Sequence, residues 1–123
     1  MRLAIQTKGS VDVMDITDRV QGAVKETGVK DGAVTIHAID DRAAVVTMRV
    51  TSDLQKRIAA YCTNDAHLCG SDLGAALLGK NQFIPIENGA ITLGDGQRIL
   101  FIDLHDGARS CTVVLETFFS VYE

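Results

Sequence analysis

Residues 83–109 constrain the fold of this chain more than any other stretch. Asn88-Gly89 lies between two short apolar runs, and this dipeptide is the strongest local signal for a β-hairpin because both central turn residues need a positive φ. Gly94 and Gly96 then interrupt the second strand, which allows a bulge or a close backbone approach. Ile99–Leu104 is a nearly continuous apolar run and therefore predicts a buried strand.

One carboxylate, Asp103, interrupts that apolar run. Burying a carboxylate costs free energy unless the charge is paired or hydrogen-bonded. Asp103 is therefore the first position at which we look for chemistry.

The remaining residues predict an α+β fold, mainly an antiparallel β-sandwich with two or three helices. Alternating or β-branched runs predict further strands at 3–5, 11–15, 33–39, 43–50 and 110–119. The first helix is expected to run from an N-cap at Thr17 to a stop at Gly28. A second is expected from Thr51 or Ser52, with Leu54, Ile58, Tyr61 and Cys62 on its apolar face, and residues 63–70 are expected to form a polar loop. A third is expected from Ser71-Asp72 to Gly79, with Leu73, Ala76 and Leu77 on one face.

Composition excludes several classes of protein. At 123 residues the chain predicts one domain, and its net charge of −4 without any cluster of basic residues argues against nucleic-acid binding. No apolar run is long enough for a signal peptide or a membrane span. Three cysteines, an odd number, predict reduced thiols and hence a cytoplasmic protein without a membrane partner.

The hairpin and the strands after it also resemble the signature of the YjbQ-like family, some members of which are named secondary thiamine-phosphate synthases. Weaker similarity extends back to about Asp15. The matching positions are Ile84-Pro85-Ile86, Asn88-Gly89, Leu93-Gly94, Gln97, Ile99, Asp103 in place of a family Glu, and Asp106-Gly107-Ala108-Arg109.

The resemblance implies a single YjbQ-like domain over residues 1–123, a homotrimer, and weak thiamine-phosphate synthase-like activity on small phosphorylated substrates. The family's clustered histidines are replaced here, since their places fall on Asp40 and Asp72, while His67 stands in for a third. The alternative is a trimeric ligand-binding or scaffold protein that has lost the chemistry together with those histidines.

If the protein is an enzyme, the resemblance implies that the acid–base or metal-binding residues are Asp103, Asp40, Asp72 and His67. The substrate-binding candidates are Gln97, Arg98, Arg109 and His105. A pocket rich in carboxylates favours Mg²⁺, Ca²⁺ or Mn²⁺ over Zn²⁺, or it holds no metal. Taken singly, each Asp is typical of a turn or a helix cap.

Three smaller features have competing interpretations. The Gly94–Arg98 loop predicts either an anion site, with Arg98 and Arg109 supplying charge, or a bulged hairpin with solvated arginines. His37, within a strand, predicts a surface or interface histidine. Cys62, Asp65, His67 and Cys69 form a second cluster in the sequence. It predicts either a functional site, as a zinc site or a Cys–His nucleophile, or a structural role in which Cys62 packs as a small hydrophobe.

Overall fold

The computed structural model describes residues 1–9, 11–64 and 72–120. The strands are β1 (Arg2–Gln6), β2 (Asp12–Asp15), β3 (Gly32–Ala38), β4 (Ala43–Arg49), β5 (Asn81–Glu87), β6 (Ala90–Ile91), β7 (Gln97–Asp103) and β8 (Ser110–Phe119), and the helices are α1 (Thr17–Thr27), α2 (Leu54–Asn64) and α3 (Asp72–Leu78). All described strand pairs are antiparallel. The predicted α+β sandwich is confirmed.

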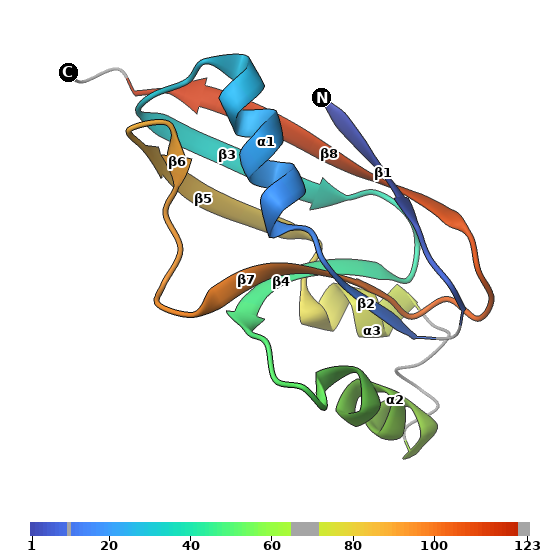
Figure 1. Ribbon diagram of the computed structural model, residues 1–123. Helices are drawn as coiled ribbons and strands as arrows, with labels where there is room; N and C mark the ends of the chain where they lie inside the picture. Colours follow the sequence, from blue (N-terminus) through green and yellow to red (C-terminus); the bar gives the residue numbers. More distant parts are fainter. Residues whose placement is uncertain (10, 65–71, 121–123) are drawn as a thin grey trace.

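Two sheets form the sandwich. The five-stranded sheet has the order β1-β8-β3-β5-β6, and the three-stranded sheet has the order β2-β7-β4 (Figure 1). Their facing sides share one apolar core, in which Ile36 and Leu115 of the larger sheet meet Val45 and Phe101 of the smaller one. Successive strand residues point to opposite faces, so β7 directs Ile99, Phe101 and Asp103 into this interior.

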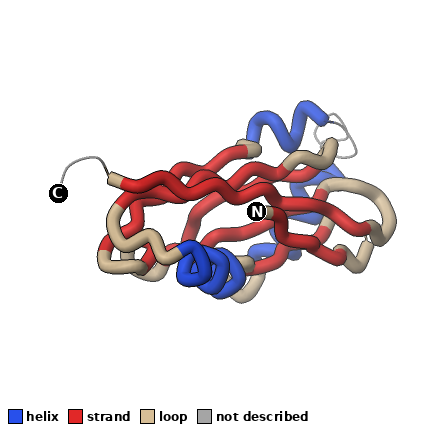
Figure 2. Tube along the Cα trace, turned by 90° about the horizontal axis from the view of Figure 1, so that it is seen from above, coloured by secondary structure: helices blue, strands red, loops and turns tan. Residues whose placement is uncertain are grey.

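The helices cover different parts of the sandwich. The buried face of α1, including Val20 and Val24, belongs to the same core, and Figure 2 shows α1 nearly end-on beside the strands. On the outer face of the smaller sheet, Ala44 and Ile102 join Ala75 of α3 in a second cluster, with Ile58 of α2 packed against it. None of the described helices is long and apolar enough to cross a membrane.

The local turn signals are confirmed. Asn88 and Gly89 adopt φ values of 53° and 79°, as the hairpin between β5 and β6 requires. Gly28 ends α1 in the left-handed region at φ 75°. Gly32 permits a close approach of β3 and β8, because a Cβ at this position would overlap the carbonyl oxygen of Phe118.

The predicted N-cap of α1 is wrong. Ile16, and not Thr17, occupies the N-cap position of α1. The backbone N–H of Thr17 donates to Asp15 Oδ1 at 3.0 Å, and its hydroxyl donates to the same oxygen at 2.6 Å. That hydroxyl also accepts the backbone N–H of Ile99, so Thr17 ties the helix to β7.

The predicted apolar face of α3 is also reversed. Gly74 and Ala75 are buried, whereas Leu73 and Leu77 are 55% and 69% exposed. Small side chains let α3 approach β4, and the leucines are left on the other side. In α2, Leu54 is buried as expected, but Tyr61 is 59% exposed. The expected loop begins later, since α2 continues to Asn64, and its remainder lies outside the described residues.

Candidate functional site

Asp103 is the last residue of β7 and is fully buried, with 0% exposure. Its Oδ1 accepts Arg109 Nη2 at 2.8 Å, and its Oδ2 accepts Arg109 Nε at 3.2 Å. This is a two-bond guanidinium–carboxylate pair, the geometry that best compensates a buried carboxylate. The sequence expectation that Asp103 needs a partner is met by Arg109, six residues later in the chain.

Arg109 is held from a second side by Asp41 in the turn between β3 and β4. Its Nη1 lies 3.0 Å from Asp41 Oδ1, and its Nη2 also donates to the Asp41 carbonyl oxygen. The hydrogen bond to Asp103 raises the pKa of Arg109. In turn the Arg109 guanidinium lowers the pKa of Asp41. Arg109 and Asp41 are therefore charged at neutral pH. Sequence reasoning missed Asp41.

Cys111 is a second residue of this cluster that sequence reasoning missed. It is buried beside the pair, with its Sγ 3.8 Å from Asp103 Oδ2. Burial, reinforced by the neighbouring Asp103 charge, raises the pKa of the Cys111 thiol to about 11. Because the thiolate is the reactive form, this cysteine is not an activated nucleophile. Its alternation with Val113 and Leu115 along the final strand was the available signal that it points inward.

Asp40 and Asp72 lie near this end of the sandwich but hold backbone groups. Asp40 Oδ2 accepts the backbone N–H of Thr112 at 2.7 Å, and Asp72 Oδ1 accepts that of Arg42 at 3.1 Å. Lys80 fixes the turn further, since its Nζ donates to the Asp40 carbonyl oxygen at 2.7 Å. These carboxylates act as turn and capping groups, the alternative that the sequence left open.

The described residues do not form a metal centre. Among them, no three His, Cys, Asp or Glu side chains converge in a way that could hold an ion. Both oxygens of Asp103 already accept from Arg109, so the donor set of Asp40, Asp72 and Asp103 does not fit a hard cation. His67, Asp65 and Cys69 lie outside the described residues, as does the side chain of Cys62.

His105 belongs to the Asp103 end of the site. Its backbone N–H donates to Asp103 Oδ1 at 3.1 Å, and its Nδ1 lies 3.1 Å from the Gly107 carbonyl oxygen. The ring is half-buried. His37 lies elsewhere, on the outer face of the five-stranded sheet, where its Nδ1 is 2.6 Å from Asn81 Oδ1.

Gln97 and Arg98 lie at the opposite end of β7 from Asp103, about 20 Å away at the usual rise per strand residue. Arg98 Nε is 2.7 Å from Asp15 Oδ2, and Arg98 Nη2 is 3.5 Å from Asp18 Oδ1. The predicted substrate-binding residues are thus divided between two ends of one strand. Arg98 and Arg109 do not form a single anion site within one chain.

Comparison with known proteins agrees with this architecture. The family model described as "UPF0047 protein YjbQ-like" matches residues 1–119. A UPF0047 protein of Methanothermobacter thermautotrophicus is 29% identical over 120 residues, covering 88% of this chain and 83% of the relative. A UPF0047 protein of Archaeoglobus fulgidus is 28% identical over 128 residues, covering 94% and 98%.

The fold is shared with a solved structure as well. The X-ray structure of a C. acetobutylicum protein superposes with a TM-score of 0.87 at 28% identity, covering 97% of this chain and 98% of that one. Together with the match of the family model over nearly the whole length, this shows that the chain belongs to the YjbQ-like UPF0047 family.

Proposed function

We propose that this protein is a non-catalytic member of the family that binds a small molecule as a homotrimer. One observation carries the proposal: the carboxylate predicted to react, Asp103, is fully buried and holds Arg109 with both oxygens. A general acid or base must come within hydrogen-bond reach of the proton it transfers. A carboxylate with this burial and this partner supports a structural role.

The outer face of the five-stranded sheet supports self-association. Phe83 of β5 and Phe118 of β8 are 69% and 48% exposed, and both point to this face because their strand neighbours Ile84 and Thr117 have the opposite, inward orientation. Large exposed aromatic side chains that gather on one face are typical of protein contacts. Packing this face against further copies would remove the rings from water.

The trimer is tested by light scattering. The wild-type protein should have a mass of about three times 13.2 kDa. A charge in the face, Phe118→Glu, should yield monomers, while Leu77→Glu on α3, an exposed apolar residue away from that face, should leave the trimer intact. A monomeric wild-type protein would refute the assembly.

The second candidate is thiamine-phosphate synthase-like activity on a small phosphorylated substrate. Its support is the family resemblance together with polar groups around the buried pair, namely the exposed carboxylates of Asp41 and Asp72 and the half-buried His105. Incubation with phosphorylated pyrimidine and thiazole compounds separates the two functions. We expect no product from the wild-type protein. Product formation that is lost in Asp72→Asn, a change at an exposed position, would establish the enzyme instead.

A further inference from the structure

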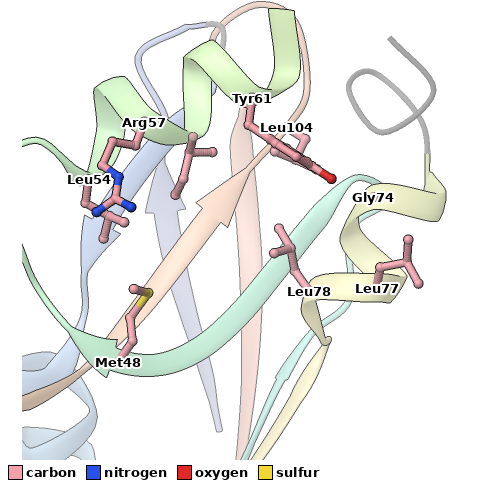
Figure 3. A pocket seen from close by; sticks show the side chains of 9 residues that line it. Met48, Leu54, Arg57, Tyr61, Gly74, Leu77, Leu78 and Leu104 are labelled. Atoms are coloured by element: carbon pink, nitrogen blue, oxygen red, sulfur yellow. The ribbon is translucent and has the colours of Figure 1, made fainter. Parts of the chain in front are cut away.

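An apolar cavity of about 540 Å³ lies between α2, α3 and the outer face of the three-stranded sheet. Its volume is within the range of small-molecule sites, roughly 300–1,000 Å³. Figure 3 shows side chains of both helices directed toward Met48 of β4 and Leu104, the residue after β7. The cavity is on the opposite face of this sheet from Asp103, because Leu104 and Asp103 are neighbours in the chain and point to opposite faces.

The packing of α3 explains why this space is open. Gly74 and Ala75 bring α3 onto β4, while Leu77 and Leu78 remain 69% and 44% exposed along the cavity. Removing exposed apolar surface from water is favourable, roughly in proportion to the area that is buried. A ligand with an apolar body would cover these leucines together with Met48.

The polar groups of the lining restrict the ligand further. Among the described residues that line this cavity, Arg57 is the only one with a charged side chain, and none carries a carboxylate. Figure 3 shows the Arg57 guanidinium directed from α2 into the space above Met48, with the Tyr61 hydroxyl directed toward α3. Within the described part of the chain, Arg57 forms no ion pair.

We propose that this cavity binds a small amphiphile with one anionic head, whose apolar chain lies against Met48, Leu78 and Leu104 and whose head pairs with Arg57. The inference rests on the proposed binding function and names its ligand class. A cationic amphiphile is excluded by the charge of Arg57, and a strongly polar molecule by the leucine lining.

The probe is decanoate, titrated calorimetrically below its micellar concentration. The wild-type protein should bind one decanoate per chain, and decyltrimethylammonium, with the opposite charge, should not bind. Arg57→Gln should weaken decanoate binding by about fivefold or more, and Arg57→Lys should recover part of it. Arg19→Gln, which removes an exposed arginine of α1, is the matched control and should bind as the wild type does. Decyl phosphate in a parallel titration distinguishes a carboxylate head from a phosphate head.

Absence of saturable decanoate and decyl phosphate binding by the wild-type protein would overturn the inference. Equal affinities of the wild type and a folded Arg57→Gln variant, with circular dichroism as the check, would also overturn it. If either result is obtained with a protein that is trimeric and catalytically inactive, only the ligand class proposed here is refuted, and the proposed non-catalytic function is not. Decanoate binding by an active enzyme would keep the cavity site and refute the non-catalytic function.

Discussion

Strand β7 lies between two arginine–aspartate pairs that differ in burial. At its Asp103 end, the carboxylate is 0% exposed and the Arg109 side chain 18% exposed. At its Arg98 end, the arginine and Asp15 side chains are 39% and 36% exposed. One strand therefore carries a guanidinium–carboxylate pair in a nearly dry interior at one end and the same kind of pair in water at the other.

The difference teaches which pair the fold depends on. A solvent-exposed ion pair contributes roughly 0–1 kcal/mol, because water and salt screen it. A buried pair adds little beyond an apolar replacement, yet removing one partner costs about 3–5 kcal/mol because the other charge is left buried and uncompensated. The fold therefore depends on the Asp103–Arg109 pair far more than on the exposed pair. This structural role of the Asp103 carboxylate supports the proposed non-catalytic function.

Substitution of Arg109 is the most direct test of the difference in stability between the buried and the exposed pair. Arg109→Met should lower the free energy of unfolding by about 3–5 kcal/mol, since Asp103 would remain buried without its cation. Urea denaturation followed by circular dichroism measures this loss. Adding Asp103→Asn to Arg109→Met should recover a large part of it, because the amide carries no charge and still accepts the backbone N–H of His105. A loss below about 1 kcal/mol in the single variant would show that the buried pair behaves as an exposed one.

The other end of β7 provides the matched measurement. Arg98→Met should cost far less stability than Arg109→Met, because both partners are more than a third exposed and water screens the pair. In 1 M salt this cost should shrink further, whereas the cost of Arg109→Met should change little. Similar salt dependence for the two variants would remove the distinction between the ends.

Lowering the pH should produce the smallest of the expected effects on stability, and this effect concerns the exposed Arg98–Asp15 pair. Burial alone would raise the pKa of Asp15, but hydrogen bonds from Thr17 and Arg98 outweigh it and lower that pKa below its usual value. The pair therefore stabilises the fold above the unfolded-state pKa of about 4 and loses this contribution as pH falls through the folded-state pKa. The stability difference between wild type and Arg98→Met should decline between pH 6 and pH 3 in urea titrations. A difference that stays constant or grows over this interval would contradict the assignment.

Much of the fold could be predicted because its signals are local. The hairpin at Asn88-Gly89 depends on two backbone dihedrals, and the strands follow from alternation of apolar side chains. The exposed leucines of α3 and the start of α1 were predicted wrongly for a common reason. Periodicity identifies a helix face, but contacts with distant strands decided that Gly74 and Ala75 are buried and that Thr17 bonds to β7.

The candidate site was predictable only in part. The apolar run around Asp103 indicated a buried charge, and the structure places Asp40, Asp72, His105 and Arg109 at the same end of the sandwich. Asp41 and Cys111 have no local signal that separates them from a turn residue and a core residue. The family resemblance and the Gly94–Arg98 loop grouped Gln97 and Arg98 with Arg109, yet the length of β7 separates them in space.

The sequence by itself determined the turns, the strand alternation and the burial of Asp103, because each depends on residues adjacent in the chain. Only the tertiary structure decided which cation neutralises Asp103 and which carboxylates hold backbone amides. Electrostatic compensation acts through space over a few ångströms, and residues from three separate turns and strands meet at that distance only after the two sheets have packed.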